Sequence, residues 1–159
     1  MTVLEFVGEV PGTTQEVFRW HENPGAFDRL TPPWESIEVL QAVDSLRNGS
    51  KGVLRMKVGP IPITWKTEHT DYTPPSLFVD KQTQGPFKSW THYHHFEPLS
   101  DTTTKILDEI HYEAPLSFLS NAFVQKKLKR LFRYRHQQCR VDLQRHQQFA
   151  SKPKLRIAI

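Results

Sequence analysis

The segment from Trp90 to Phe96 combines aromatic bulk with ionisable imidazoles on one side of a predicted strand. Side chains alternate between the two faces of a strand, so His92 and His94 share a face with the aromatic residues at both ends of the segment. Imidazoles change charge near neutral pH and are poor material for a purely apolar core. The segment therefore predicts the lining of a pocket that binds a polar group or moves a proton.

Three further predicted strands carry the same mixture of apolar and polar side chains on one face. The residues concerned are Ile63, Trp65, Thr67 and His69; then Phe78, Asp80 and Gln82; and finally Ile106, Asp108, Ile110 and Tyr112. A curved antiparallel sheet with such a face lines a cavity. For each polar residue taken singly, the alternative is a satisfied core group or a solvent-facing one.

The turns between these strands decide which polar side chains face one another. A tight hairpin after the Asp80 strand would place Asp80 opposite Trp90 or His92, and a tight turn before the Asp108 strand would place Asp108 opposite His92 or His94. Directly opposed residues lie about 5 Å apart at Cβ. A row of carboxylate, imidazole and carboxylate can be a general acid/base or a fixed hydrogen-bond network that orients a ligand. His92, Asp80 and Asp108 are thus candidate catalytic residues, with no catalytic role committed.

Other site chemistries find less support. Alternate residues such as His92 and His94 can share a metal ion with His69 or Asp108, but His69 is expected two strands away from the other histidines. We therefore expect no metal and no cofactor. No serine lies in a Gly-x-Ser-x-Gly elbow, and the single cysteine, Cys139, lies within a predicted helix, which argues against nucleophilic catalysis.

The order of predicted elements indicates an α+β domain. A strand from Thr2 to Val10 is followed by two short helices, six strands, and a long helix that begins at Ser117 or Ser120 and runs to about Gln148. The predicted buried stripe of that helix consists of Val124, Leu128, Leu131, Arg135, Cys139 and Leu143. A strongly curved antiparallel sheet of about seven strands wrapped around the long helix buries both apolar faces.

Charge is distributed unevenly along the 159 residues. Residues 119–159 contain 11 of the 21 Lys and Arg residues but only 1 of the 17 Asp and Glu residues. A basic helix there could meet nucleic acid or an anionic membrane, or be a solvated face. The run lacks the stacking aromatics of RNA-binding modules, so we expect no specific nucleic acid partner. No apolar run approaches the roughly 20 residues that span a bilayer, and the lone cysteine fits a cytoplasmic protein.

Two sequence patterns give a family resemblance. They are Leu30-Thr31-Pro32-Pro33-Trp34 and the aromatic, acidic and histidine pattern that runs from Phe78 through Gly85-Pro86-Phe87 to Phe96. The chain resembles the START-like, birch-pollen-allergen-like superfamily (SRPBCC) of polyketide cyclase/dehydrase-like proteins, in the branch found fused ahead of NAD-dependent epimerase-like domains and labelled cell division inhibitor-like. The resemblance implies a helix-grip fold with a cavity between sheet and helix. It carries over no invariant catalytic motif.

The resemblance also bears on the domain boundaries. We expect residues 1–149 to form the helix-grip ligand-binding domain and residues 150–159 to be a linker or tail. The end of the tail, Leu155 to Ile159, resembles a strand that opens a dinucleotide-binding fold, but no glycine fingerprint follows it. The alternatives are a truncated fusion and an extra strand on the sheet edge.

The leading hypothesis is a non-catalytic module that binds a small hydrophobic ligand, such as a lipid, a polyketide-like or an aromatic molecule. The expected apolar contacts are Trp65, Phe78, Trp90, Phe96 and Tyr112, and the groups expected to orient the polar end are His69, Asp80, Gln82, His92, His94 and Asp108. One alternative is a small cyclase, dehydratase or hydrolase that uses His92 with Asp80 or Asp108. Another is an accessory domain that docks on a fused or separate NAD-dependent epimerase-like domain.

Overall fold

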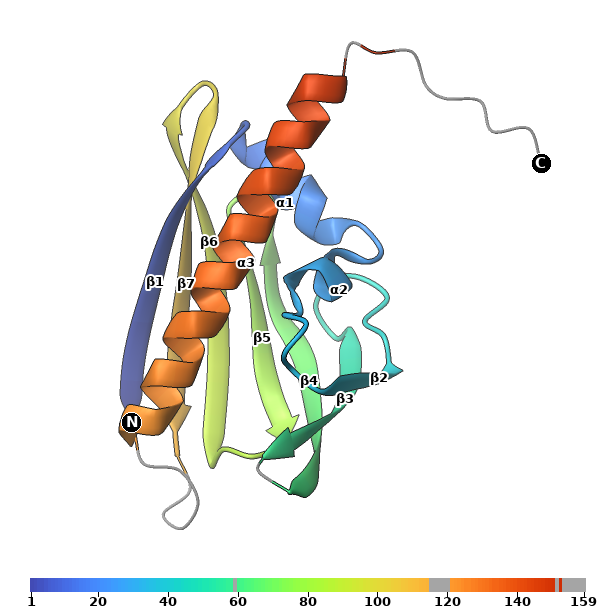
Figure 1. Ribbon diagram of the computed structural model, residues 1–159, viewed down its shortest axis with the longest axis vertical. Coiled ribbons are helices and arrows are strands. Elements are labelled where there is room, and N and C mark those ends of the chain that lie inside the picture. Colours follow the sequence, from blue (N-terminus) through green and yellow to red (C-terminus); the bar gives the residue numbers. More distant parts are fainter. Residues whose placement is uncertain (59, 115–120, 151, 153–159) are drawn as a thin grey trace, which may run out of the picture.

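The chain folds into an antiparallel sheet that curves around a long C-terminal helix (Figure 1). The computed structural model describes residues 1–58, 60–114, 121–150 and 152. Within these residues the elements, in chain order, are β1 (Thr2–Pro11), α1 (Thr14–Glu22), α2 (Ala26–Leu30), β2 (Ile37–Gln41), β3 (Lys51–Val58), β4 (Ile61–Thr73), β5 (Leu77–Gln84), β6 (Ser89–Ser100), β7 (Thr103–Glu113) and α3 (Asn121–Phe149). The predicted α+β helix-grip fold is confirmed.

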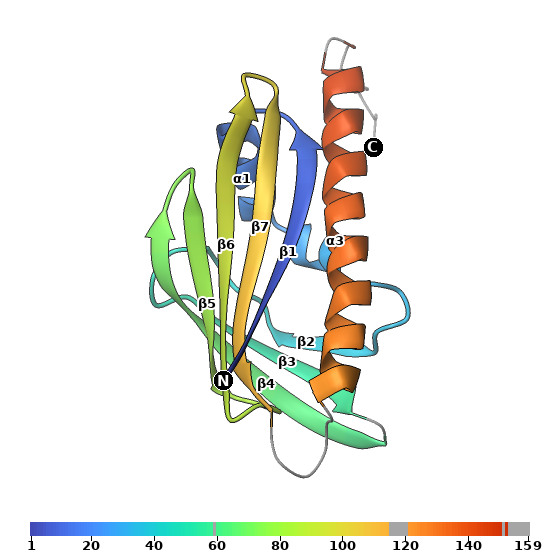
Figure 2. The ribbon, with the colours of Figure 1, turned by 90° about the vertical axis from the view of Figure 1, so that its left-hand side faces the viewer.

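The described strands form one sheet in the order β1-β7-β6-β5-β4-β3-β2. Each neighbouring pair is antiparallel, so β1 closes against β7 and is one edge of the sheet, while β2 is the other edge. Figure 2 shows α3 running alongside the sheet, with β1 as the strand nearest to it. The concave face thereby turns its side chains toward α3, and this is the face that the alternating pattern predicts.

The two short helices begin and end where local chemistry requires it. The Thr13 side chain accepts a hydrogen bond from the Glu16 backbone N–H, and the Glu16 carboxylate accepts from the Thr13 backbone N–H, which is a capping box for α1. Asn23, which precedes Pro24, ends α1 in an extended conformation. Thr31 ends α2 in the same way before Pro32.

The buried stripe of α3 differs from the predicted one. The buried residues are Val124, Leu128, Phe132, Cys139 and Leu143, whereas Leu131 and Arg135 are only half-buried. Phe132 is buried in place of the predicted Leu131. Leu131 lies three residues after Leu128 and Phe132 lies four residues after it, and residues at either spacing share a helix face, so the sequence is compatible with both. Predicted caps at Ser117 and Ser120 lie outside the described residues, as do residue 151 and residues 153–159 of the predicted tail.

Two apolar clusters fill the space between the sheet and the helices. The upper cluster comprises Val10, Val17, Phe18, Trp20, Ala26, Phe78, Phe96, Ile106, Cys139 and Leu143. The lower cluster comprises Trp90, Ile110, Tyr112, Val124, Leu128 and Phe132, with Trp65 and Phe87 among the half-buried residues packed against it. The buried polar residues His92 and Asp108 lie on the strands that connect the two clusters.

Candidate functional site

Strand register brings four of the predicted polar residues together on the concave face. Asp80 of β5 pairs directly with His92 of β6, and His94 of β6 pairs directly with Asp108 of β7. Each pairing is one of the two alternatives that the turns predict. All four side chains lie on the same face of the sheet, because directly paired residues point to the same side and His92 and His94 are two residues apart on β6.

The four side chains form a closed ring of imidazole and carboxylate contacts, which we call the His–Asp ring. His92 Nε2 lies 2.8 Å from Asp108 Oδ1, and His92 Nδ1 lies 3.3 Å from Asp80 Oδ2. His94 Nε2 lies 3.0 Å from Asp80 Oδ2, and His94 Nδ1 lies 3.1 Å from Asp108 Oδ1. The two imidazoles lie with their ring centroids 3.6 Å apart and their planes tilted by 39°. Each carboxylate is thus bridged by both imidazoles, deep enough that His92 and Asp108 are almost fully shielded from solvent.

A fifth residue, His136, joins the ring from α3. Its Nε2 lies 2.6 Å from Asp108 Oδ2, so the two oxygens of Asp108 contact three imidazoles. The close approach depends on Gly8 of β1, because a Cβ built at Gly8 would lie 2.6 Å from His136 Nδ1. The sequence reading missed His136. The available signal was its place four residues after Phe132 on the buried helix face.

Electrostatics favour charge within the ring despite its burial. Burial opposes protonation of His92, but hydrogen bonds to Asp108 and Asp80 outweigh it and raise the His92 pKa. Burial would raise the pKa of Asp80, but hydrogen bonds from His92 and His94 hold that pKa below its usual range. Burial likewise opposes ionisation of Asp108, and hydrogen bonds from His136, His92 and His94 hold its pKa well below the usual value. The two carboxylates therefore stabilise the protonated form of the His92 imidazole.

Aromatic side chains flank the ring on both sides. Phe78 stacks on His94 with ring centroids 3.9 Å apart, on the upper side. Trp90 packs against Trp65 at 5.2 Å and against Phe87 at 4.9 Å, on the lower side. Within the described residues, the Trp65 Nε1 atom is buried and has no hydrogen-bond partner. An unpaired buried donor costs stability, so this indole is suited to an acceptor from a bound molecule.

The ligand-sized cavity that the sequence predicts is not open in this structure. The cavity beside the ring measures about 20 Å³, and its lining consists of His21, Leu30, His94, Ile106, Asp108, Arg135, His136 and Cys139. That volume suits about one water molecule, whereas small-molecule pockets measure roughly 300–1,000 Å³. The interior cavity is small because the aromatic side chains that were predicted to line a pocket pack against one another. Phe96 and Tyr112, for instance, are almost completely buried.

His21 of α1 is a second buried histidine that the sequence reading missed. Its Nδ1 lies 2.8 Å from the Val17 carbonyl oxygen, and its ring packs edge-on against Phe96. Burial lowers the His21 pKa to about 4. His21 is therefore neutral at physiological pH and contrasts with His92 in the neighbouring ring.

Other predicted site residues have local partners away from the ring. His69 Nδ1 lies 3.0 Å from the Ser45 carbonyl oxygen, and burial lowers the His69 pKa. Gln82 donates to the Phe87 carbonyl oxygen over 2.8 Å and so closes the hairpin between β5 and β6. The Tyr112 hydroxyl donates to the Asn121 side chain at the start of α3.

The ring also contains groups that could hold a metal ion. Asp80, His92 and His94 each place one ligand atom within 4.8 Å of the others. His69 lies outside this group, as its distance in the sheet suggested. In this structure the same atoms are satisfied by one another through imidazole–carboxylate contacts. The expectation that no metal binds stays a prediction.

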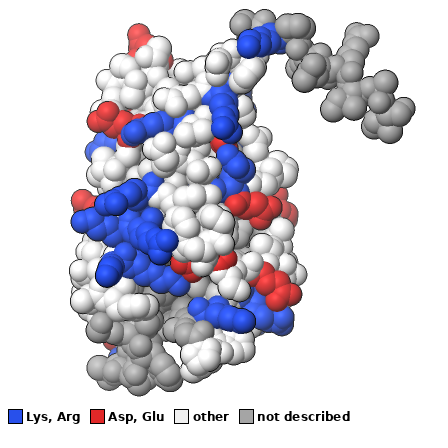
Figure 3. All heavy atoms as spheres, viewed as in Figure 1, with Lys and Arg blue, Asp and Glu red and all other residues white. Residues whose placement is uncertain are grey.

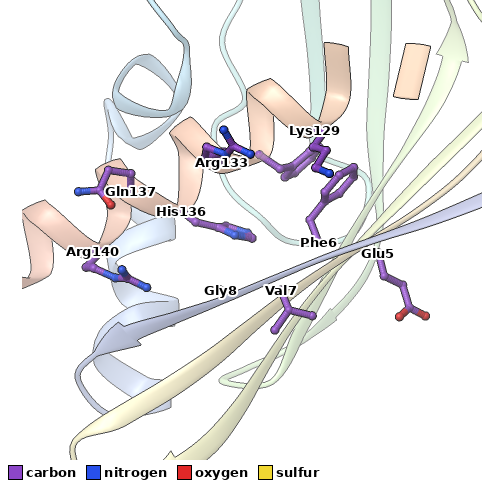
Figure 4. Close-up of a pocket in the computed structure, with 10 residues that line it drawn as sticks. Glu5, Phe6, Val7, Gly8, Lys129, Arg133, His136, Gln137 and Arg140 are labelled. Atoms are coloured by element: carbon purple, nitrogen blue, oxygen red, sulfur yellow. The ribbon is translucent and has the colours of Figure 1, made fainter. Parts of the chain in front are cut away.

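A larger depression lies outside the interior, between the edge strand β1 and α3. It measures about 370 Å³, and its lining consists of Glu5, Phe6, Val7, Gly8, Lys129, Phe132, Arg133, His136, Gln137 and Arg140 (Figure 4). We call it the β1–α3 groove. Of the residues that the structure describes, His136 alone lines both the groove and the small interior cavity, so it lies between them.

The sequence matches one protein family. Residues 10–135 match the family described as "Polyketide cyclase / dehydrase and lipid transport". The matched segment includes the whole His–Asp ring and Phe132 of α3, and it stops one residue before His136. No curated protein matches the chain.

Solved structures share the fold at low sequence identity. A nucleoside-diphosphate sugar epimerase from Corynebacterium glutamicum is 24% identical with a TM-score of 0.76, and the match covers 93% of this chain but only 30% of that one. A START superfamily protein from Mycobacterium smegmatis is 12% identical, with a TM-score of 0.69 and coverage of 90% and 97%. The Zhui aromatase/cyclase from a Streptomyces species is 14% identical, with a TM-score of 0.68 and coverage of 94% and 98%. These similarities show a common fold.

Among the described helices, none combines the length and the apolar character needed to cross a membrane.

Proposed function

Because the chain belongs to the polyketide cyclase/dehydrase and lipid transport family, we propose that it binds a small hydrophobic ligand between the sheet and α3. The observation that carries the proposal is a buried ring of ionisable groups set directly against an aromatic cluster that holds an unpaired indole N–H. An apolar body and a few fixed polar groups are the usual composition of a ligand site. The ligand class is therefore hydrophobic with one polar end.

The roles of the lining residues follow from their contacts. Trp65, Trp90 and Tyr112 contact the ligand body at the lower end, and Phe78 and Phe96 flank the other side of the ring. His92 and Asp108 orient the polar end, with Asp80 and His94 as their partners. His69 and Gln82 act indirectly, since both already bond to backbone carbonyls that shape the adjoining loops.

Entry of the ligand requires volume that the described interior does not hold in the closed state. The lower cluster supplies it most readily, because Val124 and Leu128 of α3 cover Trp65 and Trp90 there. We propose that the first half of α3 moves away from the sheet as the ligand enters. Burial of the ligand replaces the side-chain contacts that α3 gives up, at about 25 cal/mol per Å² of apolar surface.

The test is a fluorescence titration with N-phenyl-1-naphthylamine, an uncharged hydrophobic probe. We expect binding by the wild-type protein, an affinity lowered by about tenfold in Trp65→Ala, and no change in Val7→Ala. Val7 is a matched control, because its side chain is 58% exposed and lies on the outer face of the sheet. Absence of probe binding, or an equal loss in both variants, would contradict the proposal.

A catalytic role is the second candidate, and the raised pKa of His92 is the observation that favours it. An imidazolium between two carboxylates can give a proton to a substrate and recover it, as a cyclisation or dehydration requires. General acid–base groups contribute roughly 100- to 10,000-fold to rate. His92→Gln would then nearly abolish turnover and leave affinity intact, whereas in a pure binding site it changes affinity alone.

An accessory role beside an NAD-dependent epimerase-like domain remains a third proposal. It is supported by the similarity to 30% of the Corynebacterium glutamicum protein named a nucleoside-diphosphate sugar epimerase. The proposed boundary at residues 149–150 and the cytoplasmic location expected from the lone Cys139 belong to the same proposal. Co-purification of an epimerase-like protein with the tagged chain would support it, and its absence under crosslinking would count against it.

A further inference from the structure

The β1–α3 groove has a basic wall made by one face of α3. Lys129, Arg133, His136 and Arg140 follow one another at steps of four, three and four residues, which keeps them on the same side of the helix. All four line the groove. Figure 4 shows the side chains of His136 and Arg140 reaching from α3 toward β1. The helix face that meets the sheet edge is thus cationic.

Among the described residues, no carboxylate pairs with Lys129 or Arg133 of this wall. Lys129 and Arg133 are exposed and form no ion pair with any described residue. Glu5 is the one acidic residue of the lining, and Figure 4 shows its carboxylate pointing away from α3. Figure 3 shows Lys and Arg side chains gathered over α3 on this side of the molecule. The positive potential inside the groove is therefore available to a bound anion.

The floor of the groove is fixed rather than loose. Arg140 donates to the Glu9 carbonyl oxygen over 2.7 Å and 2.9 Å, which ties α3 to the free edge of β1. His136 is held by Asp108, and its Nδ1 lies against Gly8 at the floor. Phe6 and Phe132 stack at 4.6 Å and close one end. A shaped, partly pre-organised site needs little ordering when a ligand binds.

We propose that the β1–α3 groove binds the phosphate group of a small anionic ligand. Lys129 and Arg133 hold the phosphate, since a guanidinium matches phosphate oxygens with two parallel hydrogen bonds and a lysine adds a point charge. A volume of about 370 Å³ is within the range of small-molecule sites and holds more than the phosphate alone. The site is separate from the hydrophobic interior, because His136 stands between them.

The phosphate can belong to a soluble phosphate ester or to a lipid headgroup, and two titrations distinguish these sources. One adds inorganic pyrophosphate to ¹⁵N-labelled protein at about 150 mM salt and follows the amide resonances of Gly8 and Gln137. The other measures co-sedimentation with phosphatidylglycerol/phosphatidylcholine vesicles. We expect saturable pyrophosphate shifts at the groove for a soluble ester, and Arg133-dependent vesicle binding without those shifts for a headgroup.

The variants are Arg133→Glu and Lys129→Glu, with Lys57→Glu as a matched control. Lys57 is exposed on β3, far from the groove in the sheet order, and forms no ion pair with a described residue. Losing a charge-assisted hydrogen bond costs about 1.5–3 kcal/mol, so we expect each groove variant to weaken binding by about tenfold or more. Arg133→Lys should restore part of the affinity.

Three results would overturn the proposal. They are the absence of binding in both titrations, an equal loss in Lys57→Glu, and pyrophosphate shifts that map away from Gly8 and Gln137. Circular dichroism spectra of the variants are compared with that of the wild type to check that the exposed substitutions leave the fold intact. The uncharged naphthylamine probe reports on the interior separately. Normal probe binding by Arg133→Glu therefore shows that a failure of the groove proposal is not a failure of the proposed function.

Discussion

The two apolar clusters on either side of the His–Asp ring differ in how they are enclosed. In the upper cluster, Val17, Phe18 and Trp20 of α1 pack between the sheet and the second half of α3. The buried residues of the lower cluster belong to the sheet and α3, and the half-buried Trp65 packs against them with an indole nitrogen that has no hydrogen-bond partner among the described residues. Because α1 packs on the upper cluster, we expect that cluster to be the more stable of the two. We propose that the lower cluster is the part that yields volume to a ligand.

The substitution with the largest expected effect disrupts the packing of the upper cluster and leaves the lower cluster unchanged. Phe18→Ala removes a fully buried ring that contacts Phe78 and Phe96, so the free energy of unfolding should fall by about 3–5 kcal/mol. Urea denaturation measures it, with Phe27→Ala on the exposed surface of α2 as control. Probe affinity of the folded protein should stay within about twofold. A strong loss of affinity would show that the upper cluster also holds ligand.

A second substitution tests the ring that connects the clusters. Asp108→Asn removes one of the two carboxylate partners of His92 and the carboxylate that His136 contacts, so we expect a stability loss of about 3 kcal/mol near pH 7. Glu109→Gln, the next residue on the outer face, should cost less than about 1 kcal/mol. Because the Asp108 pKa is depressed, its contribution is present above about pH 4 and is lost as pH falls through the folded pKa. Equal losses in the two variants would contradict the ring's role.

The two buried histidine environments predict opposite responses to acid. His21 has its pKa lowered to about 4, so the folded state loses stability as pH falls below about 6.5, by roughly 2 kcal/mol between pH 7.5 and pH 5. His92 has a raised pKa, so its contribution is fully present below about pH 6.5 and is lost as pH rises through its folded value. Urea titrations of His21→Gln should show a smaller acid loss than wild type. An unchanged pH dependence would refute this assignment.

The substitution with the smallest expected effect on stability distinguishes the apolar contact of the Trp65 ring from hydrogen bonding by its indole N–H. Trp65→Phe keeps an aromatic ring but removes the unpaired indole donor, so the free energy of unfolding should change by less than about 1 kcal/mol. For a ligand that offers an oxygen acceptor, such as 1-naphthol, affinity should fall by about tenfold at most, while naphthalene affinity stays constant. A matched loss for both ligands would show that the indole nitrogen has no partner in the bound state.

Much of the fold was predictable because it rests on local patterns. Alternation along β5, β6 and β7 identified the inward faces, and the short turns between these strands narrowed the partners of Asp80 and of Asp108 to two residues each, one of which is the observed partner. Thr13 and Pro24 indicated where α1 begins and ends.

The features that the sequence did not predict depend on tertiary contacts, which no local sequence pattern encodes. Leu131 with Arg135 and Phe132 with His136 are both consistent with a buried face of α3, and only the packing against β1 selects the second pair. Gly8 shows the same limitation, since its role is to admit His136 from a helix far away in sequence. The closure of the interior was also not predictable, because an alternating aromatic face fits a filled core and an open pocket equally well.

The most direct test of the account is the position of a bound uncharged ligand. Isotope-filtered NMR of the complex with N-phenyl-1-naphthylamine should give intermolecular nuclear Overhauser effects to the indole protons of Trp65 and Trp90 and to the ring of His92. It should give none to Phe18 in the upper cluster. Contacts only to the outer-face residue Val3, or only to the groove residues Val7 and Gln137, would contradict the claim that the interior beneath the first half of α3 is the binding site.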